Sequence, residues 1–318
     1  MNKFRVAFAA ILTMLSASMY AENEPVKYID SDGLEKYVTD YTVLTGDEDS
    51  LTSGWYVVNQ PALSSHSGLM INGDVRIILC DECVWSINEV VNGNPCPFAT
   101  YMGSCLRFYA QSTGEYAGKL HEDEKALNAF NCCPYFFNGD SLEINGGIIE
   151  FIGWDDNSPV IVAQNVTING GRLNLSKIEC GISCHNLHLN GGELNISASD
   201  MAVIVGQELS FGKSYCDFDC ECSSFAYYGD DDISLSNFMR VKFNDREFIG
   251  SAPYDITDVE NVTKISSRYD EELALAIDGV DNFVGASDVW FTLAGVRLIA
   301  KPTEKGVYIH NCRKVQIK

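Results

Sequence analysis

Apolar and polar residues alternate with period two along much of this chain, and one such pattern recurs four times between residues 136 and 211. The copies read FFNGDSLEI (136–144), VIVAQNVTI (160–168), GISCHNLHL (181–189) and VIVGQELSF (203–211), and they start 24, 21 and 22 residues apart. Alternation of this kind places the apolar side chains on one face of a β-strand. A repeat of this length, with two short strands per copy, is typical of a stacked solenoid.

The order within each copy predicts how successive copies stack. In the first copy Leu142 and Ile144 alternate with polar neighbours, Asn-Gly-Gly follows, and Ile149 and Phe151 continue the alternation. Glycine can take the positive φ that a corner between two strands requires. We therefore predict an all-β protein, a right-handed parallel β-helix with residues 142–144, 166–168, 187–189 and 209–211 in register in one sheet. The alternative is a flat array of antiparallel hairpins.

The rest of the sequence suggests four further segments around this solenoid. Residues 1–21 combine Lys3 and Arg5 with an apolar stretch and then small residues, the order of a secretory signal peptide. We predict an N-terminal strand-bearing cap at 22–58, the β-helix at 59–250, an irregular linker at 251–284 and a small C-terminal β module at 285–318. No later stretch is long and apolar enough for a transmembrane segment.

Charge and cysteine content narrow the possible partners. The net charge is −22 at pH 7, and it becomes more negative by two once the signal peptide with its two basic residues is removed. Such a surface repels nucleic acid. The twelve cysteines are an even number, which permits disulfides in an exported chain. Cys80 and Cys83 form the only CxxC and lack a second pair for zinc, so we expect packed thiols and a few disulfides.

Three stretches resemble a known group of exported proteins. They read DYTVLTGDEDSLTSGWYVV (40–58), INGDVRIIL (71–79) and LRFYAQSTGEYAGKL (106–120). They resemble the opening of secreted Bacteroidetes β-helix proteins that are often labelled carbohydrate-binding, although Ala110 stands where those proteins have glycine. The resemblance implies a secreted or cell-surface β-helix with a polysaccharide or another surface molecule as partner.

The C-terminal sequence WFTLAGVRLIAKPTEKGVYIHNCRKVQIK (290–318) carries a second resemblance. It is similar to the sorting module that the type IX secretion system reads, with Cys312 where that module usually has glycine. The resemblance implies secretion machinery as a partner and passage through the periplasm to the cell surface. Residues 297–318 hold six Lys or Arg against Glu304, which contrasts with the acidic body. The alternative is a hairpin that only covers the end of the solenoid.

Candidate ligand-binding residues are exposed aromatics next to polar groups, because sugars stack on rings and hydrogen-bond to side chains. Two clusters fit this description: Trp154 with Asp155, Asp156 and Asn157, and Tyr227 with Tyr228. The carboxylates of Asp230, Asp231 and Asp232 could hold calcium; no other cofactor is indicated.

Catalytic motifs are missing from the sequence. It contains no nucleophile elbow, phosphate loop or zinc motif, and no Arg or Lys lies beside either aspartate cluster. The sequence therefore favours a non-catalytic secreted or cell-surface protein that binds a polysaccharide or a surface partner. The alternative is a polysaccharide lyase, which needs a base next to carboxylates, or a glycoside hydrolase, which needs two facing carboxylates.

Overall fold

The structure, a computed structural model, describes residues 23–65, 68–87, 96–122, 135–152, 159–212, 215–220, 225–228, 233–235, 239–249, 262–269, 290–292, 297–298, 302–303, 306–310 and 313–317. All regular elements in these ranges are β-strands, which confirms the all-β prediction. Within the same ranges there is no helix with the length and apolarity needed to cross a membrane.

The described N-terminal residues form an antiparallel hairpin of β1 (Val26–Ile29) and β2 (Glu35–Val38). Tyr28 of β1 anchors the hairpin to the large sheet, since its ring lies 4.6 Å from that of Trp55 and 5.3 Å from that of Tyr109. The hairpin is held at the turn by Asp30, whose carboxylate accepts from the backbone N–H groups of Asp32 and Leu34.

A single large sheet follows and contains nineteen strands among the described residues. They are β3 (Thr42–Val43), β4 (Ser50–Val58), β5 (Ala62–Ser65), β6 (Leu69–Leu79), β7 (Val84–Ile87), β8 (Phe98–Thr100), β9 (Cys105–Ala110), β10 (Lys119–Glu122), β11 (Phe137–Ile144), β12 (Ile148–Ile152), β13 (Pro159–Ile168), β14 (Arg172–Leu189), β15 (Glu193–Phe211), β16 (Tyr215–Cys220), β17 (Phe225–Tyr227), β18 (Ser234–Leu235), β19 (Met239–Phe243), β20 (Arg246–Ile249) and β21 (Lys264–Tyr269).

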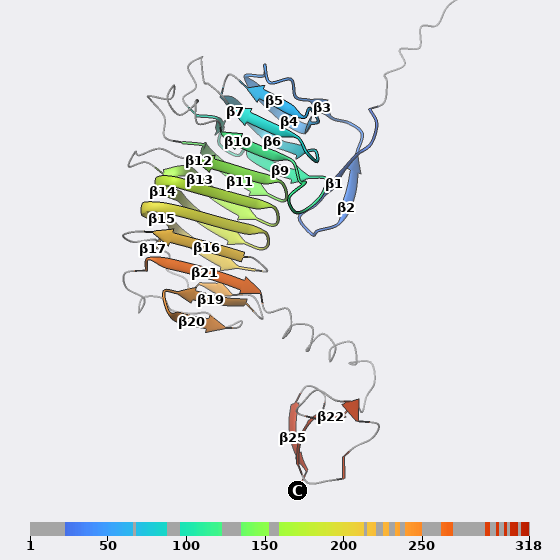
Figure 1. Cartoon of the computed structure of the whole chain (residues 1–318), viewed down its shortest axis with the longest axis vertical. Coiled ribbons are helices and arrows are strands. Elements are labelled where there is room, and N and C mark those ends of the chain that lie inside the picture. Colours follow the sequence, from blue (N-terminus) through green and yellow to red (C-terminus); the bar gives the residue numbers. More distant parts are fainter. Residues whose placement is uncertain are drawn as a thin grey trace, which may run out of the picture.

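Successive repeats pair in parallel, as the sequence pattern predicts. Leu142 lies opposite Val166, Val166 opposite Leu187, and Leu187 opposite Leu209. The predicted register of the four segments is therefore confirmed, and antiparallel hairpins do not form there. Figure 1 shows the strands stacked one above the next along the long axis of the molecule. The long strands β14 and β15 each pair over both halves of a repeat.

The core is formed by the apolar side chains that point inward from the stacked strands. The four stacked residues Leu142, Val166, Leu187 and Leu209 are all at most 1% exposed. Burial of such side chains contributes about 1.5–3 kcal/mol each. Because every repeat contributes the same inward positions, the core is one continuous cluster along the stack, and each repeat depends on its neighbours.

Parallel pairing extends beyond the repeats that the sequence makes obvious. It begins at β3, inside the segment 22–58 that we expected to be a cap, and continues to β18. Antiparallel pairing then takes over, as β21 pairs with β16 and with β19, and β19 pairs with β20.

The C-terminal strands form a sheet of their own. β22 (Trp290–Thr292), β23 (Arg297–Leu298), β24 (Gly306–His310) and β25 (Arg313–Ile317) pair antiparallel in the order β23-β22-β24-β25. No described residue of this sheet pairs with a strand of the large sheet. These strands lie within the segment 285–318 for which a small β module was predicted.

Candidate functional site

Most of the residues singled out from the sequence lie outside the described part of the chain. This holds for Trp154, Asp155, Asp156 and Asn157, and for Asp230, Asp231 and Asp232. Tyr227 belongs to β17, where its backbone lies opposite Val205, and its side chain is not described. Tyr228 is 72% exposed and its N–H donates to the Val205 carbonyl at 2.9 Å. The two clusters therefore stay predictions.

A different site is built from the corners of three neighbouring repeats. Each corner is an Asn-Gly-Gly sequence, at 145–147, 169–171 and 190–192, and we call these three segments the corner row. The second glycine of each has positive φ, for example +72° at Gly171. A Cβ on Gly171 would lie 2.6 Å from the Gly147 carbonyl oxygen. Only glycine therefore lets these corners stack. The glycine positions of the stacked corners form a strip of surface without side chains.

One repeat departs from this pattern, and its longer connection lies beside the stacked glycine corners. Ten residues, 109–118, separate the register positions of Phe108 and Lys119, where only three, 145–147, separate their partners Ile144 and Ile148. We call residues 111–117 the inserted loop. It is exposed over residues 113–116, and Tyr116 at its tip is 72% exposed.

The inserted loop is tied down by the turn of the repeat before it. Ser112 Oγ donates to Asp81 Oδ1 at 2.7 Å, and the N–H of Glu82 donates to the Tyr116 carbonyl at 2.8 Å. The turn itself is closed by a hydrogen bond of 3.2 Å from the Cys83 N–H to the Cys80 carbonyl. Both ends of the loop are thus fixed against a neighbouring turn rather than left free in solvent.

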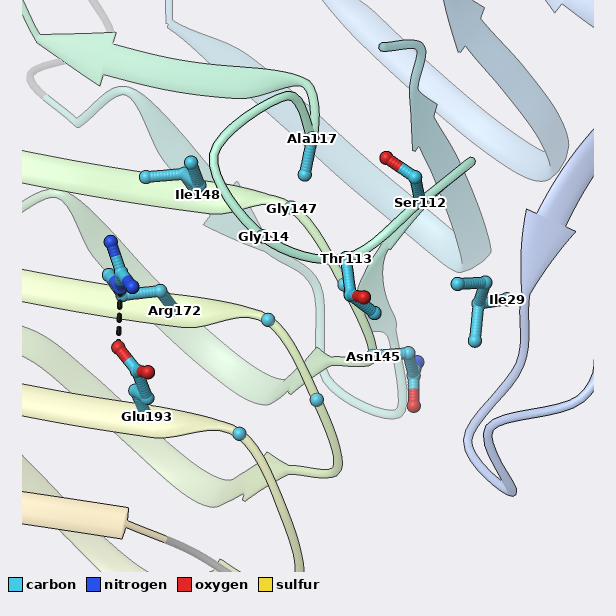
Figure 2. Close-up of a pocket in the computed structure, with 14 residues that line it drawn as sticks. Ile29, Ser112, Thr113, Gly114, Ala117, Asn145, Gly147, Ile148, Arg172 and Glu193 are labelled. Atoms are coloured by element: carbon cyan, nitrogen blue, oxygen red, sulfur yellow. Dashed lines mark hydrogen bonds and ion pairs between the residues drawn. The ribbon is translucent and has the colours of Figure 1, made fainter.

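Between the inserted loop and the corner row lies a groove of about 310 Å³, which we call the corner groove. Ile29 at the end of the N-terminal hairpin lines it as well, so three parts of the chain meet there. Figure 2 shows Asn145 on the side of Ile29 and the pair Arg172 and Glu193 on the opposite side, with glycine corners between them. The groove is open to solvent and crosses successive repeats.

Charged groups at one side of the groove are already paired with each other. Arg172 Nε donates to Glu193 Oε2, and this hydrogen bond raises the pKa of Arg172 above its ordinary value. Glu115 and Glu150 act on Arg172 in the same direction, while Lys119 forms an ion pair with Glu150. The acids outnumber the bases in this set, so the groove does not present a free cation to an anionic ligand.

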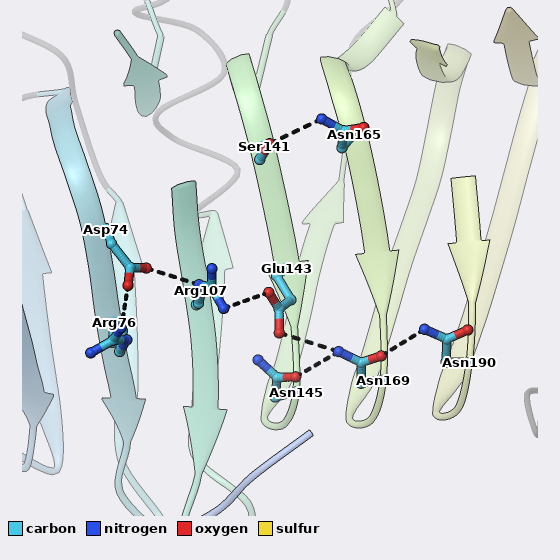
Figure 3. A network of polar contacts seen from close by, with 9 residues as sticks. All are labelled: Asp74, Arg76, Arg107, Ser141, Glu143, Asn145, Asn165, Asn169 and Asn190. Carbon is cyan, nitrogen blue, oxygen red and sulfur yellow. Dashed lines mark hydrogen bonds and ion pairs between the residues drawn. The ribbon is translucent and has the colours of Figure 1, made fainter. Parts of the chain in front are cut away.

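Asparagine side chains form a hydrogen-bonded ladder along the corner row (Figure 3). Asn190 Nδ2 donates to Asn169 Oδ1 at 2.9 Å, and Asn169 Nδ2 donates to Asn145 Oδ1 at 2.8 Å. Asn169 Nδ2 also donates to Glu143 Oε1 at 3.2 Å. Because a carboxylate only accepts hydrogen bonds, Glu143 fixes the amide orientation of Asn169. Asn145 must then turn its oxygen toward Asn169 and its nitrogen away.

The nitrogen at the end of this ladder has no acceptor in the described part of the chain. Asn145 is 3% exposed, and its Nδ2 is a buried donor without a hydrogen bond. A buried donor left unpaired costs about 1–3 kcal/mol. The ladder stops there because Tyr109 occupies the equivalent position of the preceding repeat, beside Phe108 opposite Ile144. An oxygen of a bound ligand could satisfy this donor.

The acidic face next to the ladder is organised by Arg107. Its guanidinium lies 2.9 Å from Asp74 Oδ1 and 3.0 Å from Glu143 Oε2, and Asp74 also pairs with Arg76 (Figure 3). These contacts position Glu143, which in turn orients Asn169. Arg76 lies over the ring of Trp55 at 5.3 Å. The network therefore connects the N-terminal part of the sheet to the asparagine ladder.

The described cysteines are poor candidates for nucleophilic or metal chemistry. Four of them, Cys80, Cys83, Cys105 and Cys184, are free thiols. Burial raises the pKa of Cys80 and of Cys184 to about 12 and that of Cys105 to about 11. No three His, Cys, Asp or Glu residues in the described ranges are grouped so that they could hold a metal ion.

The sequence does contain a signal for the corner groove, although we did not interpret it in that way. The connection from Phe108 to Lys119 lacks the Asn-Gly-Gly of the later corners and is seven residues longer than the connection from Ile144 to Ile148. An insertion at a corner of a stacked repeat is where a solenoid forms a local surface feature.

Comparison of the chain with protein-family models, with curated proteins and with solved structures finds no match. No relative therefore supplies a ligand or a reaction for the corner groove. The resemblances seen in residues 40–120 and 290–318 remain predictions, and the chemistry of the groove has to be inferred from its own residues.

Proposed function

We propose that this protein is a secreted or cell-surface, non-catalytic β-helix that binds a polysaccharide in the corner groove. The observation that carries the proposal is a groove that crosses successive repeats and contains the unpaired amide of Asn145. A polysaccharide repeats along its length and offers many hydroxyl and ring oxygens as acceptors. The exposed Tyr116 next to the lining residue Ala117 adds an aromatic ring of the kind on which sugars stack.

The charges around the groove favour an uncharged polysaccharide. Arg172 is engaged by Glu193, and Lys119 by Glu150, so a uronate or sulfate group would meet carboxylates without a free base. Neutral sugar oxygens need only hydrogen-bond donors such as Asn145 Nδ2 and the Thr113 hydroxyl. Binding of such a ligand should vary little with salt concentration, because screening acts only on charges.

The right-handed β-helix is part of this proposal. The parallel pairing of residues 21 to 24 positions apart supports a chain that winds through one rung per repeat. Connections between parallel strands of one sheet are right-handed in about 98% of cases. Measurement of the handedness in an experimental structure tests this point directly, and a left-handed winding would contradict it.

Binding and catalysis can be separated with the purified chain lacking residues 1–21. We expect slower migration through gels that contain a neutral polysaccharide, with no new reducing or unsaturated ends after long incubation. Replacement Thr113→Trp should fill the groove and abolish the retardation, since Thr113 is an exposed lining residue. The matched control is Met102→Trp, at a turn residue 97% exposed and outside the groove lining.

Other results would contradict the proposal. Unchanged retardation by Thr113→Trp would place binding elsewhere on the chain, and failure to bind any polysaccharide would remove the function. Release of unsaturated or reducing ends would favour the alternative, a polysaccharide lyase or glycoside hydrolase on the same scaffold.

We further propose that residues 285–318 are read by secretion machinery and carry the protein to the cell surface. The described strands of this segment pair only among themselves, which supports a module that folds independently. A chain lacking residues 285–318 should keep its unfolding transition and accumulate in the periplasm. Normal arrival of the shortened chain at the surface would exclude sorting, and its unfolding would favour the capping alternative.

A further inference from the structure

A second pocket lies on the antiparallel end of the large sheet, far along the chain from the corner groove. It has a volume of about 190 Å³ and is lined by Arg240, Lys242, Glu247, Ser266, Ser267 and Arg268. Three bases and one acid line it, on a chain whose net charge is −22. The pocket is therefore a local exception to the charge of the whole protein.

The strand pattern explains why the bases point outward together. On β19 the buried residues Met239, Val241 and Phe243 alternate with Arg240 and Lys242. On β21 the buried Ile265 and Ser267 alternate with the outward positions Lys264, Ser266 and Arg268. Period-two alternation thus places the charged side chains of both strands on the solvent face.

Register brings two arginines directly opposite each other. Arg240 pairs with Arg268, and Lys242 pairs with Ser266, across β19 and β21. Directly opposite side chains on antiparallel strands have Cβ atoms about 4.5–5.5 Å apart, and like charges there are destabilising. Glu247 of β20 lies 3.3 Å from Arg240 and offsets part of that repulsion. The backbone of Asp217 on β16 pairs with that of Ser266 on the other side of β21.

We propose that this pocket binds the oxyanion group of an anionic polymer, a sulfate or carboxylate carried on a glycan. A guanidinium binds such a group through two parallel hydrogen bonds, and an ammonium adds a point charge. A ligand oxyanion between β19 and β21 would neutralise the charge that Arg268 and Lys242 bring together. The Ser266 hydroxyl is a further donor in the lining. This site is chemically opposite to the corner groove and does not depend on it.

Two resins with the same sugar backbone test the site. At low salt we expect the chain lacking residues 1–21 to be retained on immobilised dextran sulfate in spite of its acidic net charge, and to elute as salt rises. Lys242→Ala and Arg268→Ala together should weaken the affinity for dextran sulfate about tenfold or more, as expected for lost charge-assisted hydrogen bonds. Retention on unmodified dextran should not change. Both side chains are exposed, so equal unfolding temperatures should verify that the variants fold.

The matched control is Lys264→Ala, which removes an exposed base from the same strand but outside the pocket lining. It should leave retention on dextran sulfate nearly unchanged. A native chain that flows through dextran sulfate would overturn the site. Retention that survives the double substitution would also overturn it, because binding would then belong to the basic C-terminal segment. If Lys264→Ala weakened retention on dextran sulfate equally, the effect would come from general surface charge and the proposed site would be overturned.

Discussion

Glu122 lies opposite Ile87 in the parallel pairing of β10 with β7, at a position that faces the core. Its side chain is 4% exposed, and its Oε2 has no hydrogen-bond partner in the described ranges. Burial raises the pKa of this carboxyl to about 8. At neutral pH the native protein therefore holds a neutral carboxylic acid within its apolar core.

This acid should make the protein less stable as pH rises. The folded state binds a proton that the unfolded state has already lost between pH about 4.5 and about 8, so the stabilisation is complete below that window and lost through it. The slope is at most about 1.4 kcal/mol per pH unit. Urea unfolding of Glu122→Gln should show a flatter dependence and higher stability at pH about 8. The exposed Glu208→Gln should keep the native slope; an equal slope in Glu122→Gln would contradict the prediction.

Gly171→Ala should be strongly destabilising, because its Cβ would collide with the backbone of Gly146 and Gly147 in the neighbouring repeat. We expect a loss of about 3 kcal/mol or more in the free energy of unfolding, from strain and overpacking together. Gly103→Ala is the matched control, since Gly103 has φ +77° and no heavy atom near its Cβ. There only the left-handed conformation costs energy, about 1–2 kcal/mol. Similar urea midpoints for the two variants would contradict close stacking of the corners.

Arg107→Gln should destabilise the fold by about 1 kcal/mol, because it leaves Asp74 and Glu143 without their shared base. The loss should shrink in high salt, where screening weakens the remaining repulsion. Lys27→Gln breaks an exposed ion pair with Glu35 and should change stability by less than about 0.5 kcal/mol. Thermal unfolding at two salt concentrations measures both effects, and a salt-independent loss would mean that packing of Arg107 matters instead.

Asn145 should be the residue of the asparagine ladder that ligand binding depends on. Asn145→Ala and Asn190→Ala each remove one ladder hydrogen bond to Asn169, but only Asn145 lines the corner groove. We expect about fivefold weaker affinity for a neutral polysaccharide in Asn145→Ala and native affinity in Asn190→Ala. Affinity electrophoresis compares the two variants, and equal affinities would exclude Asn145 as a ligand donor.

Buried thiols should resist alkylation while the protein is folded. The thiolate is the reactive form, and at pH 8 it is a small fraction for Cys184 and Cys80, whose pKa values are raised to about 12. Peptide mapping after brief treatment with iodoacetamide should find these two unmodified in native protein and modified in urea. Fast labelling of Cys184 in the native state would show that the core opens readily.

Sequence periodicity was sufficient for the parallel register but not for the site. Leu142, Val166 and Leu187 could be aligned in advance because each occupies the same position of a repeat with a glycine corner. The corner groove depends on where the inserted loop lies relative to the corners of later repeats. Thr113 and Asn145 line the same groove although they are far apart in the sequence, and no local pattern predicts that proximity. The ladder was missed for a similar reason, since Asn145, Asn169 and Asn190 were interpreted only as parts of glycine corners and stacking alone reveals the hydrogen bonds that join them.

The inserted loop leaves the backbone pairing on both sides of it intact. Phe108 still lies opposite Ile144, and Lys119 still lies opposite Ile148. This holds although the connection from Phe108 to Lys119 is seven residues longer than the connection from Ile144 to Ile148. Loop closure entropy grows only slowly with length. A segment of different length or composition could therefore be exchanged for residues 111–117 without disturbing the stacked strands. That makes this corner a natural place for variation among lineages and a usable graft point for an engineer who wants a new recognition surface on a rigid frame.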